Sequence, residues 1–165
     1  MDLLLTLAER GTYRPLWSKD VLDELRRNLA KVGIDPAAIE HRISSMNSTF
    51  PDAMVSGYAD LVPQMNCDKK DRHVLAAAIR GGAAIIVTFN LGHFPDAALE
   101  PYQLAAVHPG DFLLDQLDLY PATVADAVTS VPGAYENPPV TIPGFLDILA
   151  RSGVERFVSA IGPSL

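Results

Sequence analysis

Four polar side chains near the middle of the chain could together form a functional site. Asp68 and Asp71 stand at the expected start of a helix over 68–80, and Asn90 and His93 follow the next apolar stretch. Acids three apart on a helix share one face, and carboxylate oxygens are the ligands that Mg²⁺ and Mn²⁺ require. Ordinary capping is the competing interpretation, with Asp68 as the N-cap and Asp71 in the first turn.

Glu24 is a further carboxylate candidate, in the segment 19–33 that reads as a helix opened by Ser18. It stands on the flank of a leucine stripe and not within it. Two interpretations stay open for this side chain. It could converge with Asp71 on the same cation, or it could be a solvated residue paired with Arg27 or Asn28 along its own helix.

Asn90 and His93 follow the apolar run 83–88, and ligands gather at the strand ends of open α/β sheets. Asn90 could simply cap a turn. His93 could be a neutral metal ligand, a proton donor or a histidine packed in the loop. His73 stands two residues after Asp71, so we expect it to face elsewhere and pack. Cys67 could have a lowered pKa beside a helix N-terminus, but no partner marks it as a nucleophile.

The elements that must position these residues alternate between helix and strand. Apolar periodicity and turn residues predict helices near the N-terminus, at 19–33, 36–50 and 68–80, and strands at 12–18, 52–56, 83–88 and 104–109. This order predicts an α/β domain with a parallel sheet over 1–108. The uninterrupted apolar run 83–88 favours a strand covered on both faces. Four short helical patterns predict an acidic helical C-terminal extension over 109–165.

Composition narrows the class of protein. The chain has 165 residues, 48% apolar and 20% charged, as expected for a folded globular protein of about one domain. Residues 96–165 hold nine Asp/Glu against two Lys/Arg, so the net charge of −7 arises entirely there. No apolar run reaches the roughly 18 residues of a membrane span. One cysteine excludes an internal disulfide, and with no secretory leader pattern we expect a cytoplasmic location.

Three stretches together resemble the PIN-domain family: "WSKDVLDELRRNLA", "DKKDRHVLAAAIRGGAAIIVTFNLGHFP" and "FLDILARSGVERFVSAI". The similarity is closest to the VapC-type toxin branch with a helical C-terminal region. It implies a PIN-like parallel sheet flanked by helices and cleavage of RNA that depends on Mg²⁺ or Mn²⁺. It further implies restraint by a small antitoxin protein and often a homodimer, with no membrane partner.

The resemblance also assigns residues. Glu24 matches the acid of the family's second helix, and Asp71 matches the acid that opens the helix before the apolar strand, with Asp68 as an auxiliary. Asn90 matches the polar residue of the loop that follows. His93 departs from the pattern, because the family usually has an aspartate there. The implied catalytic set is Glu24, Asp71, Asn90 and His93, with Glu24, Asp71 and Asp68 as metal ligands.

A second departure concerns the family's first strand, which carries its first aspartate. Met1–Leu3 already falls within the following helix, so that strand has no counterpart in this sequence. Each lost carboxylate weakens the hold on a cation, and His93 favours Mn²⁺, Zn²⁺ or Ni²⁺ over Mg²⁺. Two functions therefore stay open. One is a divalent-metal-dependent endoribonuclease, which the missing acidic ligands could leave inactive, and the other is a non-catalytic PIN-like module that binds protein or RNA.

Overall fold

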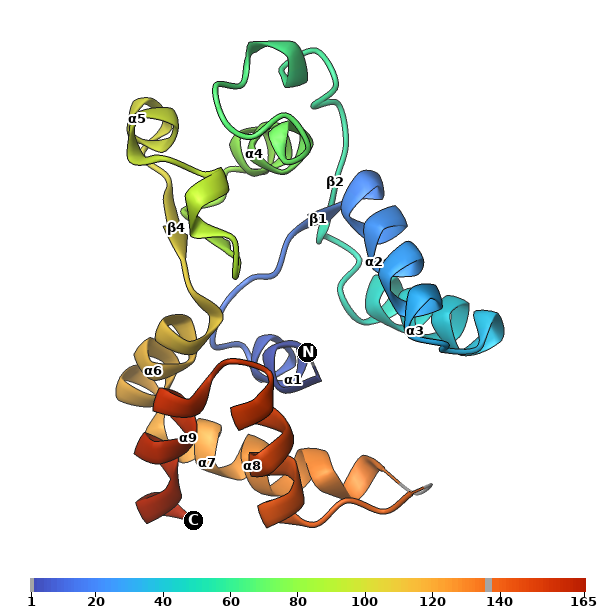
Figure 1. Cartoon of the computed structure of the whole chain (residues 1–165), viewed down its shortest axis with the longest axis vertical. Helices are drawn as coiled ribbons and strands as arrows, with labels where there is room; N and C mark the ends of the chain where they lie inside the picture. The colour runs from blue at the N-terminus through green and yellow to red at the C-terminus, as the bar shows by residue number, and fades with distance from the viewer. Residues whose placement is uncertain (1, 136–137) are drawn as a thin grey trace. The chain divides into compact units, whose positions relative to one another are not determined.

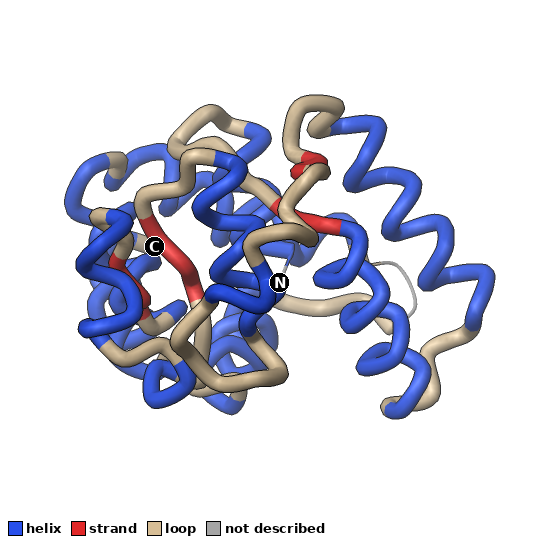
Figure 2. The backbone as a smooth tube through the Cα atoms, turned by 90° about the horizontal axis from the view of Figure 1, so that it is seen from above, coloured by secondary structure: helices blue, strands red, loops and turns tan. Residues whose placement is uncertain are grey.

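The computed structural model describes residues 2–135 and 138–165 (Figure 1). They form two units, each with its own core. The site unit comprises Pro15–Ile86 and Asn90–Ala106. The helical unit comprises Met1–Arg14, Val87–Phe89 and Val107–Leu165. Figure 2 shows that helices make up most of the chain and that its strands are short.

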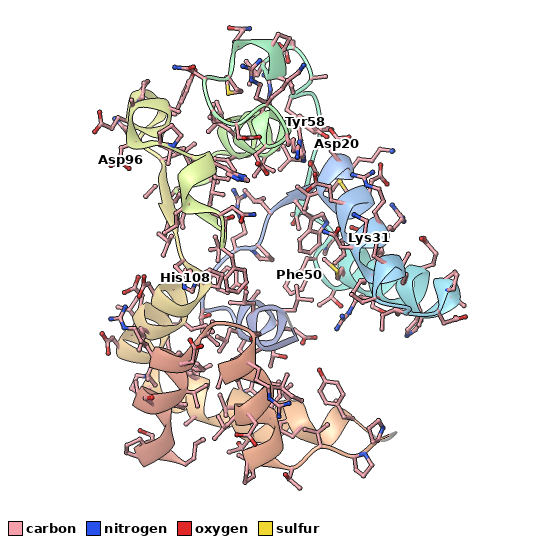
Figure 3. All side chains as sticks on the ribbon, in the orientation of Figure 1. Asp20, Lys31, Phe50, Tyr58, Asp96 and His108 are labelled. Atoms are coloured by element: carbon pink, nitrogen blue, oxygen red, sulfur yellow. The ribbon has the colours of Figure 1, made fainter. Side chains whose placement is uncertain are left out.

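Two helices of the site unit begin at caps that the sequence predicts. Ser18 precedes α2 (Lys19–Lys31), and its hydroxyl accepts a hydrogen bond from a helix backbone N–H at 3.3 Å. Asp35 precedes α3 (Pro36–Thr49), and its carboxylate accepts two such bonds. Side-chain caps of this kind satisfy backbone donors that the first turn leaves unpaired. The Tyr58 hydroxyl donates to Asp20 at 2.8 Å and so fastens the first turn of α2 (Figure 3).

The strands form two separate parallel pairs, so the predicted α/β class is confirmed. β1 (Trp17–Ser18) pairs in parallel with β2 (Met54–Val55). β3 (Ile85–Val87) pairs with β4 (Ala105–Val107). The backbone hydrogen bonds at the two ends of this pair join residues in the same order along both strands, so these strands are also parallel. Two-stranded sheets of this size depend on packing against helices for their stability.

The prediction that β3 is covered on both faces was wrong. Ile86 is buried at 7% exposure, but Ile85 is 41% exposed and Val87 is 36% exposed. Successive strand residues point to opposite faces, so the described residues bury one face of β3 and leave the other partly exposed. An apolar run alone does not reveal which face has a neighbour.

Helix α4 (Arg72–Gly81) anchors the core of the site unit. Leu75 and Ala76 are completely buried, in a cluster with residues of β2, β3 and the segment that follows. A Cβ built on Gly81 would lie 2.8 Å from Val55 Cγ2, so a larger residue where α4 meets β2 would require its neighbours to shift. The shorter elements of this unit are η1 (Val62–Gln64), η2 (Leu91–His93), α5 (Asp96–Leu99) and η3 (Glu100–Tyr102).

The helical unit packs around the completely buried side chains of Leu7, Phe157 and Ile161. Its four predicted C-terminal helices are present. Arg10 contacts Asp126 at 2.6 Å and donates to the Thr123 carbonyl at 3.1 Å. The elements are α1 (Asp2–Glu9), α6 (Pro109–Leu119), α7 (Pro121–Ser130), η4 (Val131–Ala134), α8 (Ile142–Arg151), α9 (Glu155–Ile161) and η5 (Gly162–Ser164).

The predicted division at residue 108 stays a prediction. α1 packs on α7 within the helical unit, although it stands at the opposite end of the sequence. None of the helices in the described ranges has both the length and the apolar character that a membrane span requires.

Candidate metal centre

Asp68, Asp71 and His93 come together in the site unit. Their candidate ligand atoms all lie within 4.8 Å of one another. Among the described residues, no other group of three or more His, Cys, Asp or Glu side chains is arranged closely enough to hold a metal ion. The sequence prediction named all three of these side chains as site residues.

A turn directly before α4 positions the carboxylates of Asp68 and Asp71. The Lys70 N–H donates to the Asp68 carboxylate at 2.9 Å, and the Asp71 N–H donates to the Asp68 carbonyl at 3.0 Å. Local bonds of this kind compete with helix formation, so α4 begins only at Arg72 and the expected start at residue 68 was wrong. Asp71 occupies the N-cap position, but its side chain makes no capping hydrogen bond. Its carboxylate is therefore not used by the helix cap and contacts His93 instead.

The loop after β3 brings His93 to this turn through two hydrogen bonds. The Asp68 N–H donates to the His93 carbonyl at 3.0 Å, and His93 Nδ1 lies 2.7 Å from Asp71 Oδ2. The Asp71 side chain is 20% exposed and that of His93 is 42% exposed, so the centre stands at the surface.

The donor set fits a divalent cation of intermediate softness. Two carboxylates suit Mg²⁺ and Mn²⁺ equally, whereas an imidazole nitrogen is a poorer ligand for Mg²⁺ than for Mn²⁺ or Zn²⁺. The three side chains thus favour Mn²⁺ over Mg²⁺. A cation on Nδ1 would replace the hydrogen bond between His93 and Asp71, because Nδ1 can either donate a proton to the carboxylate or offer a lone pair to a cation.

Glu24 lies outside this three-residue group. Its Oε1 is 3.7 Å from Nε2 of His73, in the first turn of α4. The His73 side chain is 15% exposed, and its Nε2 is buried with no hydrogen-bond partner among the described residues. Glu24 and Asp71 are therefore both associated with the N-terminal end of α4, although no direct contact joins them.

As expected, His73 is packed and does not join Asp68, Asp71 and His93, but its contact with Glu24 was not predicted. That expectation assumed a helix already running at Asp71, which would turn residues two apart to different sides. Because α4 begins at Arg72, His73 stands in the first turn, beside α2. The sequence analysis did not predict the turn at Asp68–Asp71 that precedes α4. In the sequence, this turn corresponds to the order acid, Lys, Lys, acid.

Asn90 contributes to the site through its backbone. Its carbonyl accepts a hydrogen bond from the His93 N–H at 3.0 Å, which closes the turn that presents the imidazole. Cys67 precedes the cluster, and burial, followed by the negative charge of Asp71, raises the pKa of its thiol. The suggestion of a lowered thiol pKa was therefore wrong, and Cys67 is not set up as a nucleophile.

Comparisons with known proteins cover most of the chain. Residues 1–92 match the family model described as PIN domain, and residues 109–163 match the one described as VapC50 C-terminal domain. A protein of Mycobacterium tuberculosis named "Putative ribonuclease VapC50" is 55% identical over 112 residues. That alignment spans 66% of this chain and 66% of the relative, just under two thirds of its length. No solved structure matches the chain significantly.

Proposed function

The chain belongs to the PIN-domain family, in its VapC-type branch, and we propose that it is an endoribonuclease dependent on a divalent cation. The observation that carries this proposal is the convergence of Asp68, Asp71 and His93 on a region less than 4.8 Å across. A relative whose name describes a ribonuclease supports the choice of RNA as substrate.

Each side chain has a proposed role. Asp68 and Asp71 would hold the cation, and His93 would complete the ligand set or pass a proton to the leaving group. A bound divalent cation would neutralise charge that develops on the phosphate and lower the pKa of the attacking water. Glu24 would act through a bound water and not as a direct ligand. Asn90 would keep the His93 turn in place.

The resemblance to VapC-type toxins extends the proposal to partners. We expect a small antitoxin protein to bind and restrain the nuclease, and the nuclease to form a homodimer. RNA is the proposed substrate, so the reaction would take place in the cytoplasm.

Cleavage of RNA tests the proposal directly. The wild type is incubated with single-stranded RNA and with structured tRNA in Mn²⁺, in Mg²⁺ and in EDTA. We expect cleavage that requires the cation and falls at least a hundredfold in Asp71→Asn, in line with the loss of a main transition-state contact. Asp118→Asn removes an exposed carboxylate of α6 outside the cluster and serves as the matched control. Equal cleavage by the wild type and Asp71→Asn would contradict the proposal.

The position of Glu24 favours one alternative function, a non-catalytic module. With Glu24 turned toward His73, the direct ligand set contains only two carboxylates. A module of this kind would bind Mn²⁺ through Asp71 and bind RNA or protein without cutting it. Calorimetric titration with Mn²⁺, paired with the cleavage assay, separates the two functions. Binding that depends on Asp71 without any cleavage would favour the module.

A further inference from the structure

The cations Lys69, Lys70 and Arg72 alternate with the carboxylates of the candidate metal centre. Lys69 and Lys70 are exposed in the turn between Asp68 and Asp71, and Arg72 opens α4 directly after it. We propose that Lys69, Lys70 and Arg72 form a phosphate-binding strip that holds the RNA backbone at this centre. The inference rests on the proposed function and adds the residues that would bind its substrate.

The first argument is the absence of partners for this strip. No hydrogen bond or ion pair of the Lys69, Lys70 or Arg72 side chains occurs within the described part of the chain, although two carboxylates stand next to them in the sequence. Cations elsewhere are matched to acids at 2.6–3.0 Å, in the pairs Arg10–Asp126, Lys19–Asp23, Arg26–Glu40, Arg80–Asp60 and Arg156–Asp111.

Other cations in the described part of the chain also make no hydrogen bond or ion pair through their side chains, but they are not gathered at a site. Arg27 and Lys31 stand on α2 and Arg151 stands at the end of α8. The run from residue 69 to residue 72 is the place where three unmatched cations stand within four positions. It coincides with the carboxylate cluster.

The second argument is the environment of the Arg72 guanidinium. Its Nε is buried and has no acceptor among the described residues. A buried donor without a partner costs free energy, more so when it belongs to a charged group. A phosphate is a strong, charge-assisted acceptor for a guanidinium, and a bidentate contact with it would draw the Arg72 group out of this position.

The third argument concerns charge. The protein carries a net charge of −7, so its long-range field repels RNA. The carboxylates of the site add to that repulsion at the point where the backbone must approach. Local cations are therefore required next to the site, and contacts to phosphates from such cations position a nucleic acid without reading its sequence. A strip that alternates with the metal ligands would place a phosphate beside the cation.

Salt-dependent RNA binding tests the inference. Binding of a fluorescently labelled single-stranded RNA is measured by anisotropy in EDTA, over a series of KCl concentrations. For single strands the slope of log K against log salt changes by about 0.7 for each phosphate contact. We therefore expect the slope to become shallower by about 1.4 in the Lys69→Gln/Lys70→Gln double variant and by about 0.7 in Arg72→Gln.

The controls separate this inference from the proposed function. Lys31→Gln removes an unmatched cation at the end of α2 (Figure 3) and should leave the slope unchanged. Calorimetric Mn²⁺ binding should persist in the two exposed lysine variants, because neither lysine is a ligand. If the wild type cleaves RNA but the strip variants have the same salt slope as the wild type, the inference is overturned and the proposed function is not. If the strip variants have a shallower salt slope but the wild type does not cleave RNA, the phosphate-binding strip is supported and the proposed nuclease activity is contradicted.

Two further outcomes also overturn the inference. One is the absence of any RNA binding by the wild type. The other is an unchanged slope for RNA together with a changed slope for a poly-glutamate peptide, which would assign the strip to an acidic protein partner. Circular dichroism of each variant shows that it is folded, and the exposed single variants Lys69→Gln and Lys70→Gln remain informative where Arg72→Gln does not fold.

Discussion

His93 Nδ1 lies 2.7 Å from Asp71 Oδ2, and this contact joins the loop after β3 to the start of α4. The contact brings an imidazole to a position where the PIN-domain resemblance leads us to expect a third carboxylate. An imidazole beside two carboxylates keeps a cation site but changes which cation fits it best. The chemistry of the site therefore depends on one substitution at residue 93.

Replacing His93 with aspartate should change the preferred cation. We expect His93→Asp to bind Mg²⁺ more tightly than the wild type does, because the ligand set becomes three carboxylates. The preference for Mn²⁺ over Mg²⁺ should fall about tenfold or more, which corresponds to about 1.4 kcal/mol. Competitive titration of Mn²⁺ against Mg²⁺, followed by calorimetry, measures this ratio. His41→Asp, at an exposed position of α3, is the control, and an unchanged ratio would show that His93 is not a ligand.

Glu24 should affect catalysis more than cation binding. Its contact at 3.7 Å is with His73 and not with the three-residue group, so Glu24→Gln leaves the direct ligands intact. We expect its Mn²⁺ affinity to stay within about threefold of wild type, a difference below 0.7 kcal/mol. Cleavage should drop by at least tenfold. Glu9→Gln, exposed at the end of α1, is the matched control. Loss of Mn²⁺ binding in Glu24→Gln would instead make Glu24 a direct ligand.

Local chemistry explains which parts of this arrangement the sequence could predict. The caps at Ser18 and Asp35 depend on residues within one turn, and both were predicted correctly. The joining of Asp71 and His93 follows from the position of a loop at a strand end, a feature common to α/β folds.

Features that depend on neighbours far along the chain were missed. The His73–Glu24 contact requires the exact first residue of α4, which the turn at Asp68 delays. The exposure of Ile85 depends on which elements cover β3, and an apolar run does not contain that information. Periodicity identifies an element, whereas its covered faces come from tertiary contacts.

Gly81 should be indispensable where α4 meets β2. An added Cβ would lie 2.8 Å from Val55 Cγ2 and 3.1 Å from Leu16 Cδ1, closer than packed atoms tolerate. We expect Gly81→Ala to lower the free energy of unfolding by about 1–3 kcal/mol. Chemical denaturation measures the loss. Gly133→Ala has nothing within 4 Å of the new Cβ and should be nearly neutral. Removing the clashing methyl groups in Gly81→Ala/Val55→Ala should recover part of the loss, and a failure to do so would place the strain elsewhere.

Tyr13 should make the stability of the helical unit depend on alkaline pH. Its hydroxyl donates to the Leu4 carbonyl at 2.6 Å, its ring packs edge-on against Phe112, and burial raises the pKa of the phenol far above its usual value. The unfolded chain releases this proton near pH 10, whereas the folded chain retains it. The stabilising contribution is therefore complete below about pH 10 and declines as the pH rises from there toward the raised pKa of the folded state.

Thermal unfolding at increasing pH should show this decline in the wild type, with Tyr102→Phe, at an exposed tyrosine, as the control. Tyr13→Phe should lose about 1 kcal/mol at neutral pH and show a smaller alkaline decline, and an identical decline would mean that another group is responsible.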